Sequence, residues 1–128
     1  MATVSSHLNR ARILVVEDQQ DVRELLVMVL EIEGHQVDEA PNAREGLQRL
    51  KSDHYDLVLS DYAMPGGTGT WMLREAEREG LLTGTSVLIV TAHPDTRDLS
   101  SLDVLAKPLD LDRFLEHVRG VLQDRRNG

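Results

Sequence analysis

The sequence alternates between two hydrophobic patterns along almost its whole length, which limits the folds open to it. Short runs of β-branched and other apolar residues predict strands at residues 13–16, 36–40, 57–60, 87–90 and 103–106. Apolar residues at three- and four-residue spacing predict helices at residues 19–33, 42–53, 71–80 and 110–122. This alternation favours an α/β fold with a parallel sheet and helices on both faces, because crossovers between parallel strands are right-handed and usually helical.

Individual residues indicate where several of these elements end. Gly34 is expected to stop the first helix. Asn42 is expected to cap the second helix by accepting a hydrogen bond from a backbone N–H near Glu45. The half-polar run at residues 36–40 predicts an edge strand. Residues 93–102 show little apolar periodicity, so a fourth helix in this segment is expected to be short.

Length and composition predict one globular domain at residues 12–124, between a loose segment at 1–11 and a tail at 125–128. The net charge of -8 and the lack of a dense Lys/Arg cluster disfavour direct binding to nucleic acid. No apolar stretch has the length of a membrane span, and cysteine is absent. We therefore expect a cytoplasmic protein. We also expect it to be either a monomer or a weak dimer.

Polar residues follow four of the five apolar runs. Glu17 and Asp18 follow the first run and Asp61 follows the third. Thr91 follows the fourth run and Lys107 the fifth. In open parallel sheets ligands bind beyond the carboxyl ends of the strands, so these five side chains can converge on one site.

The residue types at these positions suit phosphoryl transfer. Neighbouring carboxylates raise one another's pKa unless a cation neutralises them. Mg²⁺ prefers oxygen ligands and typically uses one or two carboxylates together with phosphate oxygens. The ammonium group of Lys107 and the hydroxyl group of Thr91 are suited to the negative oxygens of a phosphoryl group.

With these residues, the sequence resembles the response-regulator receiver family of two-component signalling. The matching motifs are Glu17-Asp18, the Asp-Tyr-Ala-Met-Pro-Gly-Gly-Thr-Gly segment that begins at Asp61, Thr91-Ala92, and Lys107-Pro108. The resemblance covers about residues 12–122. It implies a flavodoxin-like, doubly wound sheet of five parallel strands in the order 2-1-3-4-5, with a shortened fourth helix.

The resemblance also implies a metal site and a phosphoacceptor. Asp61 would accept the phosphoryl group from a histidine kinase or a phosphotransfer protein. Glu17, Asp18, Asp61 and the backbone carbonyl of Ala63 would hold Mg²⁺ or Mn²⁺. The domain would be a signalling phosphoacceptor that assists its own phosphorylation and dephosphorylation, rather than an enzyme. Its downstream protein target is not specified by the sequence.

The remaining motif residues would contact the phosphoryl group. The resemblance implies that Lys107 pairs with one phosphoryl oxygen and that the hydroxyl group of Thr91 donates to another. The backbone of Ala92 would contribute a further contact to this group. The Lys107–Pro108 peptide bond would be cis, which only an X–Pro bond allows at low cost.

Two departures from the family pattern stand out. Family members usually carry an aromatic residue on the fifth strand, three positions before the Lys, but this chain has Val104 there. The stretch between Thr91 and Lys107 is also several residues shorter than is usual for the family. Both features leave open a degenerate receiver that binds proteins without being phosphorylated.

Two other functional classes lack the residues that they require. A haloacid-dehalogenase-like phosphatase needs a second Asp two residues after its nucleophile, where this chain has Ala63. A dinucleotide-binding domain needs a Gly-x-Gly-x-x-Gly segment after the first strand, and no such segment follows residues 13–16. No output domain is visible, so the chain is either a stand-alone receiver or part of a longer protein.

The aromatic and histidine residues predict few additional sites. Trp71 is expected to take part in helix packing rather than to serve as a platform for a ligand. The five histidines, at positions 7, 35, 54, 93 and 117, share no metal-ligand spacing. His7, His35, His54 and His117 are therefore expected to be solvated. His93 is the exception because it lies near Thr91.

Overall fold

The computed structural model describes residues 10–62, 69–92 and 103–127. Within these residues the five strands are β1 (Arg12–Val16), β2 (Gln36–Ala40), β3 (Leu57–Ser60), β4 (Ser86–Thr91) and β5 (Asp103–Ala106). The four helices are α2 (Gln20–Ile32), α3 (Ala43–Ser52), α4 (Gly69–Arg78) and α5 (Leu111–Asn127). The short fourth helix expected at residues 93–102 lies outside the described part of the chain.

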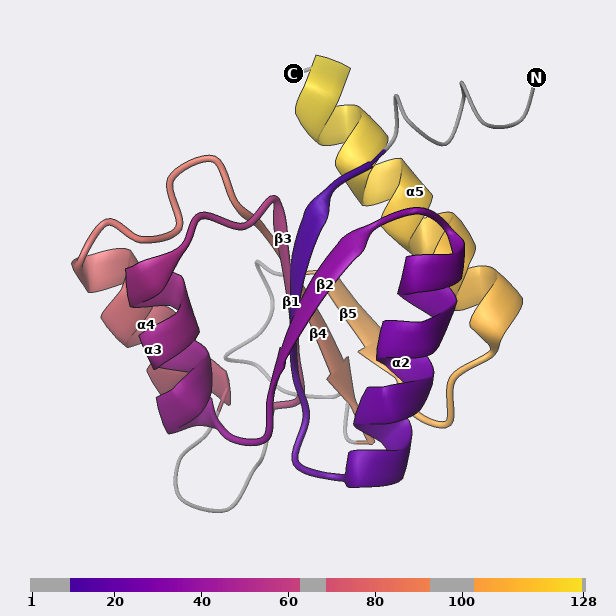
Figure 1. Cartoon of the computed structure of the whole chain (residues 1–128), viewed down its shortest axis with the longest axis horizontal. Coiled ribbons are helices and arrows are strands. Elements are labelled where there is room, and N and C mark those ends of the chain that lie inside the picture. Colours follow the sequence, from indigo (N-terminus) through magenta and orange to yellow (C-terminus); the bar gives the residue numbers. More distant parts are fainter. Residues whose placement is uncertain (1–9, 63–68, 93–102, 128) are drawn as a thin grey trace.

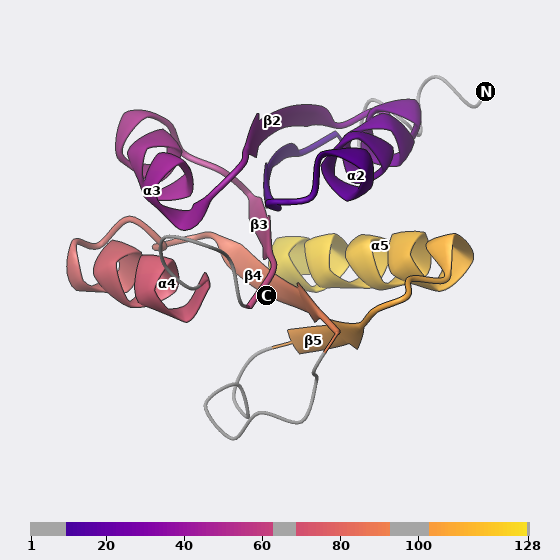
Figure 2. The ribbon, with the colours of Figure 1, turned by 90° about the horizontal axis from the view of Figure 1, so that it is seen from below.

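The strands form one parallel sheet in the order β2-β1-β3-β4-β5. Helices α2 and α5 cover one face of the sheet, and α3 and α4 cover the other (Figures 1 and 2). The predicted flavodoxin-like fold and its strand order are therefore confirmed. The half-polar strand β2 lies at the edge of the sheet, as expected.

Two layers of buried apolar side chains join the sheet to its helices. Along β1, Leu14 and Val16 belong to the layer that includes residues of α3 and α4. Ile13 and Val15 belong to the layer that includes residues of α2 and α5. Successive side chains on a strand point to opposite faces, so a continuous apolar run is needed where both faces are covered.

Two predicted helix ends are present. The side chain of Asn42 accepts a hydrogen bond from the backbone N–H of Glu45 at 2.8 Å. Gly34 follows α2 with a φ of 100°, a conformation that glycine adopts without steric cost. Within the described residues, no helix combines the length and apolar character that crossing a membrane requires.

Packing decides how far Trp71 and His35 are buried, and the expectation of a solvated side chain is wrong for His35. Trp71 is 40% exposed, whereas its neighbour Met72 is fully buried. Because α4 begins at Gly69, its inward stripe runs through Gly69, Met72, Leu73 and Ala76 and passes beside Trp71. His35 is buried rather than solvated, and its Nδ1 accepts a hydrogen bond from the backbone N–H of Ala11 at 3.1 Å.

Candidate functional site

The carboxyl ends of β1 and β3 place an acidic residue from each strand side by side. Val16 and Ser60 are partners in the parallel register, so the residues after them are neighbours. The backbone N–H of Asp61 donates to the carbonyl oxygen of Val16 at 3.1 Å. On the other side of β1, the backbone N–H of Glu17 donates to the carbonyl oxygen of Ala40 at 3.1 Å. The hydrogen bonds of the sheet therefore set the spacing between the backbones of Glu17 and Asp61.

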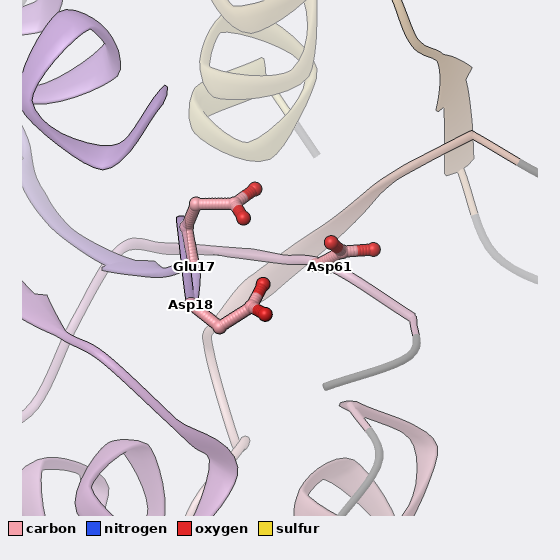
Figure 3. A group of neighbouring side chains, drawn as sticks. All are labelled: Glu17, Asp18 and Asp61. Carbon is pink, nitrogen blue, oxygen red and sulfur yellow. The ribbon is translucent and has the colours of Figure 1, made fainter. Parts of the chain in front are cut away.

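Glu17, Asp18 and Asp61 form a compact acidic cluster at this edge of the sheet (Figure 3). Each offers one carboxylate oxygen, and the three oxygens lie within 4.8 Å of one another. In the part of the chain that the structure describes, no other group of three acidic or histidine residues meets this condition. Three convergent carboxylate oxygens suit a hard divalent cation such as Mg²⁺.

Lys107 brings a positive charge to the acidic cluster from the end of β5. Its Nζ lies 2.7 Å from Oε1 of Glu17 and 3.0 Å from Oδ2 of Asp61. One ammonium group thus contacts carboxylates that follow two different strands. Because the cluster has three carboxylates and Lys107 contacts two of them, it retains negative charge that a bound cation could neutralise.

Burial makes the ionised form of Glu17 costly. Only 1% of this residue is exposed, and burial raises the pKa of its carboxyl group. Hydrogen bonds from Lys107 and from the backbone of Gln19 oppose that shift without cancelling it. For Lys107, burial alone would lower the pKa, but the hydrogen bonds to Glu17 and Asp61 outweigh it and raise the pKa. The lysine therefore remains charged beside the acidic cluster.

Thr91 is the last residue of β4 and is buried. Its carbonyl oxygen accepts a hydrogen bond from the backbone N–H of Lys107 at 2.8 Å, which joins these two site residues through the sheet edge. Ala92 is exposed beyond it. The Lys107–Pro108 peptide bond is cis, as the resemblance implied. Ala63 and His93, which were also singled out in the sequence, lie outside the described residues.

Gly69 is a site neighbour that the sequence analysis did not identify as functional. Its backbone N–H donates to the carbonyl oxygen of Tyr62 at 2.8 Å. A Cβ atom at this position would lie 2.1 Å from the carbonyl oxygen of Asp61 and 2.7 Å from Oγ of Ser60. Helix α4 thus approaches the backbone of Asp61 as closely as it does because residue 69 has no side chain. In the sequence, the signal for this close approach is the glycine that ends the segment beginning at Asp61.

Residues 13–119 match the response regulator receiver domain. The match covers most of the chain, and the fold agrees with it, so the chain belongs to this family. It is a receiver domain of the kind used in two-component systems, which is a signalling domain.

Individual relatives agree with this assignment. The response regulator ArlR of Staphylococcus aureus is 30% identical over 118 residues, which cover 88% of this chain and 52% of ArlR. The chain thus spans about half the length of the curated relatives it matches.

Solved structures show the same architecture. The receiver domain of the hybrid histidine kinase CckA is 31% identical, with a TM-score of 0.77 over 87% of this chain and 98% of that domain. The response regulator TrrA of Thermotoga maritima, solved in complex with Mg²⁺-BeF, has the same identity and TM-score over 86% of this chain and 97% of that protein. A CheY-like receiver domain from Methanospirillum hungatei has a TM-score of 0.83 at 23% identity, over 94% of this chain and 99% of that domain.

Proposed function

We propose that this receiver domain is a phosphoacceptor in which Asp61 takes a phosphoryl group from a histidine kinase or phosphotransfer protein in the presence of Mg²⁺ or Mn²⁺. The observation that carries the proposal is the convergence of the carboxylates of Glu17, Asp18 and Asp61, two of which, Glu17 and Asp61, contact the ammonium group of Lys107. Acidic pairs and lysines are common on protein surfaces. Their meeting at the carboxyl edge of a parallel sheet is what favours chemistry over a solvated surface.

The acidic cluster fits a divalent cation. Its three carboxylate oxygens lie close enough together to share one ion, and Mg²⁺ typically combines one or two such ligands with water and phosphate oxygens. The relative TrrA has been solved with Mg²⁺-BeF, which supports the same ligand class here. We assign Glu17, Asp18 and Asp61 as side-chain ligands and the backbone carbonyl of Ala63 as a further one. A bound ion would neutralise charge that builds up on the phosphoryl oxygens.

The side chains of the site then have distinct tasks in the transfer. A carboxylate oxygen of Asp61 attacks phosphorus, a P–O bond forms, and the P–N bond to the donor histidine breaks with its electron pair leaving on the imidazole. Lys107 contacts Asp61, so its ammonium group can pair with an oxygen of a phosphoryl group bound there. The hydroxyl group of Thr91 would donate to a second oxygen, and the backbone of Ala92 would add a contact. These donors stabilise charge that develops during transfer.

Helix α2 offers a surface on which the phosphodonor could dock. Leu25, Met28 and Ile32 are 39%, 51% and 76% exposed and share one face of the helix. Glu24 and Glu31 are exposed on the same helix. This pattern suits a partner helix with an apolar face bordered by Lys or Arg. Because α2 begins close to Asp18, a histidine protein bound there would lie beside the phosphoacceptor edge.

The test is phosphorylation by acetyl phosphate, a small donor that needs no docking surface. With Mg²⁺ present, intact-mass measurement is expected to find one added phosphoryl group on the unaltered chain and none on Asp61→Asn. The control variant Asp53→Asn, which changes an acid at the opposite end of the sheet, is expected to react like the unaltered chain. Absence of any adduct on the unaltered chain would overturn the proposal in favour of a binding module that works without phosphorylation.

A further inference from the structure

Arg23 joins the acidic cluster to the neighbouring edge strand. Its Nη1 donates to the backbone carbonyl oxygen of Glu17 at 2.8 Å. Its Nε lies 2.9 Å from Oε1 of Glu39 on β2. The arginine side chain is only 14% exposed, whereas that of Glu39 is 45% exposed. The guanidinium group therefore lies in a largely covered position, and two of its nitrogens donate to two different segments.

The carbonyl group that Arg23 holds belongs to the peptide unit between Glu17 and Asp18. Strand β1 ends at Val16, so the ladder hydrogen bonds of the strand do not continue through this peptide. A peptide unit is planar, and fixing the direction of its carbonyl group also fixes where the next Cα atom lies. The bond from Arg23 thus sets the position from which the Asp18 side chain starts.

The carboxylate of Glu17 is held separately. Its Oε2 accepts a hydrogen bond from the backbone N–H of Gln19 at 3.1 Å, and its Oε1 contacts Lys107. The backbone N–H of Arg23 in turn donates to the carbonyl oxygen of Gln19 at 2.9 Å. The side chain and the backbone of Arg23 thus each donate a hydrogen bond to the turn formed by residues 17–19.

We propose that Arg23 is a positioning residue for the acidic cluster, which orients the Glu17–Asp18 peptide so that the carboxylates meet at the spacing that a divalent cation requires. This inference rests on the proposed function. Outer groups that orient metal ligands typically change metal affinity by about 10- to 100-fold when they are removed. Arginine suits the task because its planar fork can hold two acceptors in one fixed geometry, whereas lysine is a single flexible charge.

Charge and positioning predict opposite effects of removing Arg23. A positive charge near the cluster repels Mg²⁺, so a residue that acted only through charge would weaken metal binding, and its loss would tighten it. A residue that orients the ligands strengthens binding, and its loss weakens it. Arg23→Lys keeps the positive charge but loses the planar guanidinium group that can bind two acceptors. Arg23→Gln loses both the charge and the guanidinium group.

The experiment is a Mg²⁺ titration of the whole chain, followed by the fluorescence of its single tryptophan, Trp71, or by calorimetry. We expect both Arg23→Lys and Arg23→Gln to bind Mg²⁺ about tenfold more weakly than the unaltered chain. Glu39→Gln, which retains an acceptor but loses the ion pair, is expected to show a smaller loss. The matched control is Arg119→Lys, because Arg119 also contacts an acid near the end of α2, Glu33 at 2.8 Å. Its Mg²⁺ affinity is expected to be unchanged.

Two additional readouts separate positioning from general destabilisation. At saturating Mg²⁺ the rate of phosphorylation by acetyl phosphate in Arg23→Lys is expected to return close to that of the unaltered chain. Without metal, amide exchange at Asp18 and Gln19 is expected to be faster in Arg23→Lys than in Arg119→Lys. Unchanged Mg²⁺ affinity in Arg23→Lys, or tighter binding in Arg23→Gln, would overturn the inference and leave the proposed function intact. Failure of the unaltered chain to bind Mg²⁺ would overturn both.

Discussion

The two ends of the sheet carry similar residues but differ in how these are arranged. At the carboxyl end, Glu17, Asp18 and Asp61 form the acidic cluster, and Lys107 contacts Glu17 and Asp61. At the amino end, Asp38, Asp53 and Asp56 surround Arg12. Nη2 of Arg12 lies 3.1 Å from Asp38, and Nη1 lies 3.4 Å from Asp53. The backbone N–H of Arg12 donates to Asp56 at 2.8 Å.

The difference lies in convergence and burial rather than in the number of charges. At the amino end, the side chains of Asp38 and Asp53 are 27% and 42% exposed, and each meets a separate donor of Arg12. At the carboxyl end, the side chains of Glu17 and Asp61 are 2% and 12% exposed and share one ammonium group. Exposed carboxylates are solvated by water, whereas converging buried ones are stabilised by a cation. Of these two groups of charged residues, the one at the carboxyl end is therefore the better suited to hold a divalent metal.

The largest expected effect tests this difference directly. Asp18→Asn is expected to weaken Mg²⁺ binding by roughly a hundredfold, or about 2.7 kcal/mol, because it removes the charge of a proposed ligand from the converging cluster. Asp53→Asn removes the same charge at the amino end and is expected to leave the affinity unchanged. Calorimetric titration of the three proteins measures this contrast. Equal losses in both variants would mean that overall charge, rather than convergence, attracts the metal.

A second comparison concerns two glycines that begin or lie within helices. Gly69→Ala would bring a Cβ atom against the backbone of Asp61, so the expected cost is about 1–3 kcal/mol of unfolding free energy. Its phosphorylation by acetyl phosphate should also be slower because the backbone of Asp61 must shift. Gly120 in α5 has nothing within 4 Å of an added Cβ atom. Gly120→Ala is therefore expected to stabilise the chain by about 0.5–1 kcal/mol.

Chemical denaturation of both variants measures these free energies. A Gly69→Ala variant as stable and as reactive as the unaltered chain would show that α4 can move away from the site without consequence.

The smallest expected effect lies at the amino end, where His35 makes stability depend on pH. Burial lowers the pKa of His35, while an unfolded imidazole titrates near about 6.5. Below that pH the unfolded chain binds more protons than the folded one, so this contribution to stability is complete above it and is lost as the pH falls. Protonation would also remove the acceptor that Nδ1 offers to Ala11.

His35→Asn retains a side-chain acceptor but does not titrate. Between pH 7.5 and 5.5, its unfolding free energy is expected to fall less than that of the unaltered chain, as measured by urea denaturation. The same replacement at the exposed His54 is the control for loss of an imidazole. Parallel pH profiles for the unaltered chain and His35→Asn would contradict the prediction.

The sequence alone determined the fold and the location of the site. Continuous apolar runs and three- to four-residue periodicity are local signals, so strands such as Ile13–Val16 and the cap at Asn42 could be predicted without knowledge of the packing. The position of the site followed because parallel strands bring their carboxyl ends to one edge, so that Glu17, Asp61 and Lys107 could be expected to meet. Family resemblance added the strand order and the cis peptide bond before Pro108.

Contacts between segments far apart in the sequence were decided only by the tertiary structure. The inward face of α4 depends on where the helix starts and how closely it packs, so Met72 is buried while Trp71 is partly exposed. The burial of His35 depends on its contact with Ala11, and the close approach of Gly69 depends on the backbone of Asp61. The bond from Arg23 to Glu17 likewise arises from the way α2 packs beside β1 and β2. Local periodicity carries no information about such distances, because they are set by the packing of whole elements against one another.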